Sequence, residues 1–79
     1  MIERKSIPVD EAYSIDIVTE RMPDGGWAVV ASIKHRSPTG EKTIDLPVSD
    51  LRYADQREAE DAGNRQARDW IVANVSHAA

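Results

Sequence analysis

Residues 13–33 read YSIDIVTERMPDGGWAVVASI, and this stretch decides the fold because a turn separates two runs of alternating residues. In the first run, the residues that share one face are apolar or β-branched: Tyr13, Ile15, Ile17 and Thr19. In the second run, the same pattern recurs at Trp27, Val29, Ala31 and Ile33. A period of two predicts a strand with one buried face. Between the runs, Pro23 suits the second position of a turn, and Gly25 suits the left-handed position after it. The stretch therefore predicts a β-hairpin.

The register of this hairpin follows from the position of its turn. Folding the chain at residues 22–26 brings the two apolar faces together, whereas a shift by one residue would turn one of them outward. The predicted pairs are Thr19 with Val29, Ile17 with Ala31, and Ile15 with Ile33.

A third strand is predicted over residues 41–46, after a turn at residues 37–40. A three-residue turn would place Asp45 opposite Ile33 and bury an unpaired carboxylate, which is costly. A four-residue loop instead places Ile44 opposite Ile33, and Arg36 opposite Glu41. We therefore expect the four-residue loop.

From Asp55 onward the period changes, and small or apolar residues recur at spacings of three and four: Ala59, Ala62, Gly63, Ala67, Trp70 and Ile71. This spacing predicts one amphipathic helix, roughly from Asp55 to Asn74, with Asp55 as the N-cap and Glu58 three positions later. A glycine inside a helix costs about 1 kcal/mol relative to alanine. Gly63 therefore predicts a close approach of the helix backbone to the sheet.

Together these elements predict an α+β fold, in which a three-stranded antiparallel meander is followed by one long C-terminal amphipathic helix packed on one face (β-β-β-α). The strand at residues 27–36 should be central, because both of its faces carry apolar residues. Pro8 interrupts residues 1–12, which we expect to form an N-terminal tail. Residues 13–75 then form the single domain, and residues 76–79 a C-terminal tail.

Length and composition exclude several classes of protein. A chain of 79 residues is one small domain, which rules out a multidomain enzyme or a repeat array. The absence of cysteine excludes disulfides, thiol nucleophiles and thiolate zinc sites. The net charge of −4 disfavours a surface built to neutralise phosphates. The longest apolar run, residues 27–31, is far shorter than the roughly 20 residues of a membrane span, so we expect a soluble, cytoplasmic protein.

No group of residues predicts catalysis, and we expect no enzyme, no cofactor and no metal. His35 would need further ligands to hold a metal, and its predicted neighbour Asp45 lies on the other face of the sheet. Asp16 and Glu20 fall on the open side of the sheet, where no cleft is expected to raise the pKa of one carboxyl.

Two surfaces remain as candidates for binding. The face away from the helix should carry Val18, Ala28 and Val30 in its middle, with Val72 of the helix as a further contributor. An apolar centre with a charged rim is typical of a modest interface. The second candidate is a basic cluster of Lys34, Arg36 and Lys42 at the second turn, which could contact a phosphate or an acidic partner.

Several segments carry a resemblance to known proteins: Tyr13, residues 24–28 (DGGWA), residues 54–59 (ADQREA) and residues 67–71 (ARDWI). They resemble a group of small uncharacterised bacterial proteins with three strands and a helix that ends in Trp-Ile. The chain is also similar to the N-terminal part of HicB-type antitoxins, which share a Gly-Gly-aromatic hairpin. The strand order looks like that of double-stranded-RNA-binding domains, but the start of the helix is acidic where those domains are rich in lysine.

The expected function is therefore a non-enzymatic protein-interaction module that self-associates as a homodimer through the open sheet face or a sheet edge. One alternative is weak nucleic-acid binding by the basic turn. A second alternative, implied by the HicB resemblance, is an antitoxin-like regulatory partner of another small protein. No membrane partner is expected.

Overall fold

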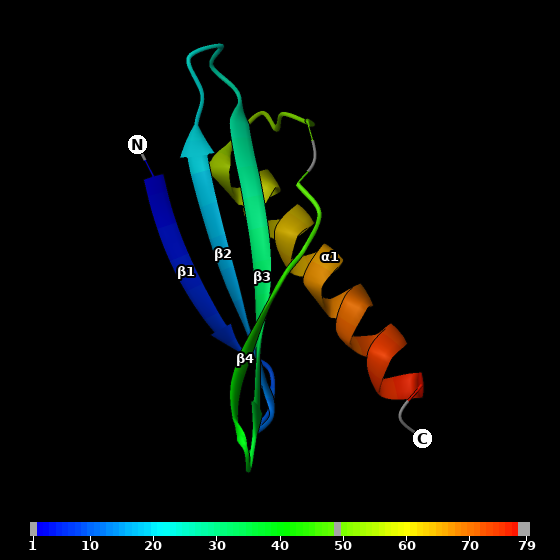
Figure 1. Ribbon diagram of the computed structural model, residues 1–79. Helices are drawn as coiled ribbons and strands as arrows, with labels where there is room; N and C mark the ends of the chain where they lie inside the picture. Colours follow the sequence, from blue (N-terminus) through cyan, green and yellow to red (C-terminus); the bar gives the residue numbers. More distant parts are fainter. Residues whose placement is uncertain (1, 49, 78–79) are drawn as a thin grey trace.

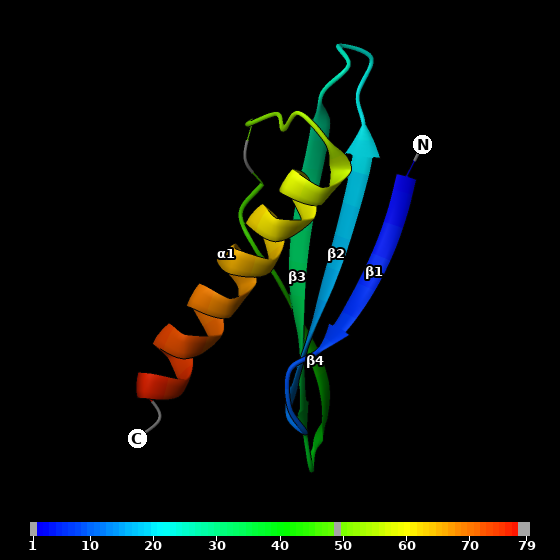
Figure 2. The ribbon, with the colours of Figure 1, turned by 180° about the vertical axis from the view of Figure 1, so that it is seen from behind.

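Four strands precede one helix along the chain, and a computed structural model describes residues 2–48 and 50–77 (Figure 1). The elements are β1 (Ile2–Pro8), β2 (Tyr13–Arg21), β3 (Trp27–Ser37), β4 (Gly40–Asp45) and α1 (Gln56–His77). The strands form one antiparallel sheet in the order β1-β2-β3-β4. The helix lies along one side of this sheet and leaves the other side uncovered (Figures 1 and 2). The α+β class and the C-terminal helix are as the sequence predicts.

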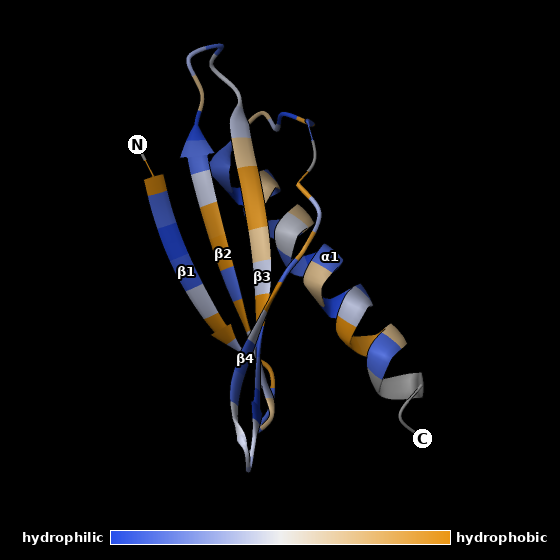
Figure 3. Ribbon diagram, in the orientation of Figure 1, coloured by the Kyte–Doolittle hydropathy of each residue, from blue (hydrophilic) through white to orange (hydrophobic). Residues whose placement is uncertain are grey.

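The central hairpin has the predicted register. Ile17 pairs with Ala31 and Ile15 with Ile33, so the apolar faces of β2 and β3 coincide. Gly25 has a φ of 91°, the left-handed conformation expected of it in the turn. Apolar residues accordingly mark the middle of both strands (Figure 3).

The β3–β4 pairing also follows the prediction, because Ile33 lies opposite Ile44 and Arg36 opposite Glu41. The ladder continues one pair further, to Ser37 and Gly40, so the turn itself is tighter than the predicted loop. Asp45 consequently lies opposite Ser32, on the uncovered side of the sheet, and no carboxylate enters the described core.

The prediction of a three-stranded sheet is wrong, because the sheet has four strands. Residues Ile2–Pro8, expected in a tail, form β1 and pair along their whole length with β2. Only Ile7 in this strand is even half-buried. An edge strand held by main-chain hydrogen bonds needs little apolar alternation, so its sequence carries a weak signal. The added strand makes β2 an inner strand, so β3 is not the only central one.

The core lies between the sheet and α1. Its buried apolar residues are Ile15, Ile17, Ala31, Ile33, Leu46, Ala59, Ala67 and Ile71. A Cβ built on Gly63 would lie 2.8 Å from Cγ2 of Val29, so the helix backbone does approach the sheet as closely as the sequence predicts. This close approach sets the distance between the two layers.

The N-terminus of α1 agrees with the prediction, whereas the helix ends later than predicted. The helix starts at Gln56, and Asp55 caps it by accepting a hydrogen bond of 2.8 Å from the Glu58 main-chain N–H. Glu58 in turn accepts from the N–H of Ala54, at 3.3 Å. The helix extends to His77, into the segment expected to be a tail, and residues 78–79 of that segment lie outside the described residues. In the part of the chain that is described, no helix combines the length and apolar character needed to cross a bilayer.

Candidate interaction face

The side of the sheet away from α1 is the candidate site, and we call it the open face. Alternation along the strands assigns to it the even-numbered residues of β1, β2 and β3 and the odd-numbered residues of β4. The intervening residues, such as Ile15 and Ile33, point toward the helix and are buried. The open face is therefore a four-stranded surface without a second layer among the described residues.

The centre of the open face is apolar. Val18 lies directly opposite Val30, as predicted, and Val30 is 40% exposed. Ala28 lies next along β3, half-buried and opposite Glu20. Cross-strand valines of this kind form a shared surface that a partner could cover.

Two further residues belong to the open face, and the sequence alone did not place them there. Arg4 of β1 lies opposite Val18, and Ile2, which is 63% exposed, lies opposite Glu20. Both residues were expected in an N-terminal tail, and only the pairing of β1 with β2 places them on the open face. β1 therefore adds the side chains of a fourth strand to the open face.

Val72 does not belong to the open face, contrary to the grouping suggested by the sequence. It is 65% exposed, but it lies on α1, which covers the opposite side of the sheet. Its position off the core stripe of the helix was inferred correctly. However, the two apolar surfaces are separated by the sheet itself.

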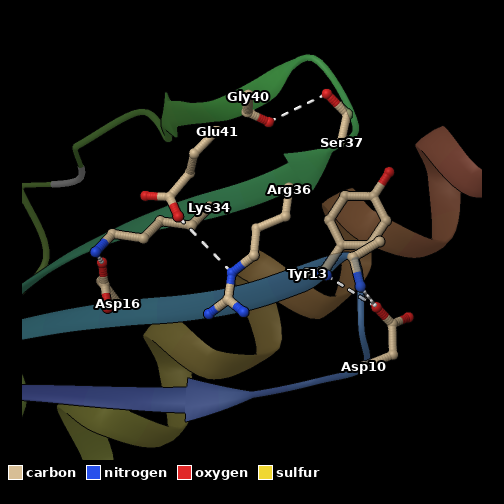
Figure 4. Close-up of polar contacts among 9 residues, drawn as sticks. Asp10, Tyr13, Asp16, Lys34, Arg36, Ser37, Gly40 and Glu41 are labelled. Carbon is tan, nitrogen blue, oxygen red and sulfur yellow. Dashed lines mark hydrogen bonds and ion pairs between the residues drawn. The ribbon is translucent and has the colours of Figure 1, made fainter.

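The polar end of the open face contains two ion pairs (Figure 4). The Lys34 Nζ lies 3.4 Å from the Asp16 carboxylate, and the Arg36 Nε lies 3.7 Å from that of Glu41. These groups are partly or largely exposed, so each pair contributes little to stability. Their main consequence is that a carboxylate already lies beside each cation.

The predicted basic cluster is divided between the two sides of the sheet. Lys42 lies opposite His35, on the side of the helix, whereas Lys34 and Arg36 lie on the open face. The His35 ring stacks on Tyr13, with ring centroids 4.6 Å apart and planes inclined by 17°. Lys34, Arg36 and Lys42 therefore do not form one patch.

Charge is distributed unevenly across the open face. Arg4 lies at the β1 side and Asp45 at the β4 side, and within the described residues neither takes part in an ion pair. Between them, β2 contributes the carboxylates of Asp16 and Glu20. Because β3 contributes Lys34 and Arg36, the sign of the charge on the open face alternates from one strand to the next.

A sheet edge was also named from the sequence as a binding surface, and the outer edge of β1 is one of the two edges of the observed sheet. The Tyr13 carbonyl accepts a hydrogen bond from Val9, at 3.1 Å, so odd-numbered residues of β2 direct their main-chain groups toward β1. Their partners are Glu3, Lys5 and Ile7. Alternation then places the free main-chain groups of β1 on its even-numbered residues.

This edge is poorly suited to pair with its own copy. An antiparallel register that sets Ile2 opposite Pro8 places Lys5 against Lys5, and a register centred on Arg4 places two arginines together. A register centred on Ser6 uses Pro8, which has no N–H to donate. Charges and proline on an edge strand are features that prevent edge-to-edge association.

A shallow hollow lies on α1. The hollow is lined by Asp61, Asn64, Arg65, Arg68 and Asp69, all on the solvent side of one helix. Inside it, the Arg68 Nε donates to the Asn64 side-chain oxygen at 3.0 Å. Among the described residues, no three His, Asp or Glu side chains gather as a metal site requires.

Comparisons of the chain with protein-family models, with curated proteins and with solved structures found no match. The similarity to HicB-type antitoxins, to double-stranded-RNA-binding domains and to small bacterial proteins therefore stays a prediction from the sequence. Any functional proposal has to rest on the open face itself.

Proposed function

We propose that this chain is a non-enzymatic protein-interaction module that binds through the open face. The observation that carries the proposal is the Val18–Val30 pair at the centre of an uncovered sheet. A face with an apolar centre and a charged rim has the composition of a protein interface.

The basic turn supports the nucleic-acid alternative less well. Lys34 and Arg36 each lie beside a carboxylate, and Lys42 is on the other side of the sheet. A phosphate backbone would have to displace Asp16 and Glu41 before it could use these cations. Given the net charge of −4, a protein partner for the open face is the better supported function.

The test is site-specific photo-crosslinking in the native host. A photoreactive residue is placed at Val30, and, as a control, at Arg65 on the solvent side of α1. We expect a crosslinked protein species from position 30 and none from position 65. The additional substitution Val18→Asp should abolish the crosslink, because it places a carboxylate in the apolar centre.

Circular dichroism of the Val18→Asp variant checks that the fold is retained. Val18 lies on the open face, outside the buried core, so we expect the spectrum to be unchanged. Equal crosslinking from positions 30 and 65, or none from position 30, would contradict the proposed function.

A further inference from the structure

We propose that the partner of the open face is a second copy of this chain, packed face to face about a two-fold axis parallel to the strands and between β2 and β3. This inference rests on the proposed function and deepens it by naming the partner and its orientation. Three properties of the described residues support it: the exposed area, the position of the valines and the arrangement of charge.

The exposed area of the chain is larger than a monomer of this size normally shows. The chain exposes 5610 Å², whereas a folded monomer of 8.8 kDa exposes about 4800 Å². Its radius of gyration is 13.4 Å, against about 11.6 Å expected for a compact chain of this length. The excess of about 800 Å² matches the area that each partner buries in a standard interface. The elongated outline of 43 × 21 × 17 Å raises both values, and the uncovered sheet face contributes to the exposed area.

The valines are placed symmetrically about the proposed axis. Val18 is on β2 and Val30 is directly opposite on β3, so the axis passes between them. Rotation about it places Val18 over the partner's Val30, and Val30 over the partner's Val18. This reciprocity is the geometry that a two-fold interface requires, and packed sheets about 10 Å apart leave room for the two layers of side chains.

The charges of the inner strands favour the same axis. On the open face, β2 carries Asp16 and Glu20, whereas β3 carries Lys34 and Arg36. An axis parallel to the strands places Asp16 over the partner's Ser32, one two-residue step from the partner's Lys34, and the same contact forms in the other direction. Opposite potentials across an interface fix its orientation.

The charges of the outer strands add a specific contact. The same axis brings β1 over the partner's β4, so that Arg4 approaches the partner's Asp45. Neither residue has an ion-pair partner within the described chain. The partner's Asp45 lies two residues along the strand from the position directly opposite Arg4. This offset is about 6.7 Å, which the long arginine side chain can cover. Each copy would contribute one Arg4 and one Asp45, so the dimer would contain this contact twice.

The other two-fold axis in the plane between the sheets runs across the strands, and it is disfavoured. At the level of Val18 and Val30, it would place β2 over β2 and so bring Asp16 over the partner's Glu20, a contact between like charges. It would also bring the two copies of Arg4 together on β1. Like-charge juxtaposition is costly in an interface, so the parallel axis is the one that the face can use.

The first experiment is sedimentation equilibrium of the purified full chain from about 1 μM to about 1 mM, the range over which a modest interface dissociates. We expect a monomer–dimer equilibrium, and we expect Val30→Asp to weaken it at least about tenfold. A wild-type chain that is monomeric throughout would overturn the inference about the partner. A dimer that is insensitive to Val30→Asp would overturn it as well, because the contact would then lie elsewhere.

The second experiment tests the orientation by charge reversal. Arg4→Glu and Asp45→Arg should each abolish self-association, because each creates two like-charge contacts in a homodimer. Mixing the two variants should restore a dimer, because the carboxylate introduced on β1 of one copy then faces the guanidinium introduced on β4 of the other. The native pair forms between the remaining two strands of the same mixed dimer. If the mixture stays monomeric while the wild type dimerises, the proposed axis is wrong.

Matched controls on the helix complete the test. Arg65→Glu and Asp69→Arg make the same charge changes on the solvent side of α1, and they should leave the dimer unchanged. Failure of the dimer proposal is distinguishable from failure of the proposed function. A strictly monomeric chain that still crosslinks another protein from position 30 would refute the dimer and retain the interaction face, whereas absence of any crosslink from position 30 removes both.

Discussion

The substitution Gly63→Ala tests the packing of helix and sheet, because two known effects oppose each other at this position. Alanine is a better helix former than glycine by about 1 kcal/mol, so the substitution would stabilise an exposed helix. At Gly63, however, the new Cβ would lie 2.8 Å from Cγ2 of Val29, closer than carbon atoms can approach. It would also lie 3.5 Å from Cγ2 of Ile17, an ordinary contact.

The clash should exceed the gain in helix propensity. Overpacking a core costs about 1 to 3 kcal/mol, and Val29 cannot turn away easily because its β-branched side chain has few rotamers. The expected net effect is a destabilisation of about 1 kcal/mol. Helix propensity acting alone would give a change of similar size and opposite sign.

The assay is urea unfolding, followed by the fluorescence of Trp27 and Trp70 and by circular dichroism. Val29→Ala alone should destabilise the chain, but in the Gly63→Ala background it should cost less, because the new methyl group then fills the vacated space. We expect a coupling of about 1 kcal/mol or more between the two positions, as is typical of residues in contact.

An exposed position on the same helix measures the propensity effect by itself. Arg65→Ala should be more stable than Arg65→Gly by about 1 kcal/mol. The reasoning would be refuted if Gly63→Ala stabilised the chain by the same amount and showed no coupling to Val29→Ala.

Three further predictions concern local structure. Asp55→Ala should cost about 1 kcal/mol in the same urea assay, because the Glu58 N–H loses its capping acceptor, and Asp55→Ser should retain most of the stability. Gly25→Ala should cost about 1 to 2 kcal/mol, because its φ of 91° disfavours a Cβ, and an equal loss on Gly25→Asn would contradict this explanation. Ile17→Ala should cost about 2 to 5 kcal/mol, enough to populate the unfolded state, and retention of a full native spectrum and midpoint would show that the core is misplaced.

Sequence reasoning succeeded for the elements with strong alternation. The β2–β3 register and the Ile33–Ile44 pairing could be predicted because the wrong register would expose isoleucines or bury Asp45. The capping role of Asp55 depends only on residues within a single helical turn. These predictions use interactions that are local, or that the apolar pattern determines directly.

β1 could not be predicted in the same way. Its residues are exposed except for the half-buried Ile7, so no apolar period marks the strand. Two of its contacts with the helix are polar and join residues distant in sequence: the bond that Gln56 donates to Glu3 and the 3.7 Å pair of Lys5 with Glu60. Partners so far apart along the chain leave no local pattern.

The candidate site was predicted in part, for a related reason. Val18, Ala28 and Val30 could be grouped because hairpin register determines which side chains share a face. Val72 and Lys42 were grouped wrongly, since sequence patterns indicate exposure or nearness along the chain but not the side of the sheet. Arg4 and Ile2 joined the face only through the pairing of β1.

The sequence by itself determined the class of the fold, the central hairpin with its register, the helix with its cap, and the close approach at Gly63. Each follows from short-range sterics or from the need to bury apolar side chains. The tertiary structure alone decided that an N-terminal strand widens the sheet and that Val72 and Lys42 lie away from the open face. It also decided that Arg4 and Asp45 occupy opposite sides of one uncovered face. The physical reason is that surface charges and edge strands form weak, long-range contacts, whose partners become defined only after the core has formed.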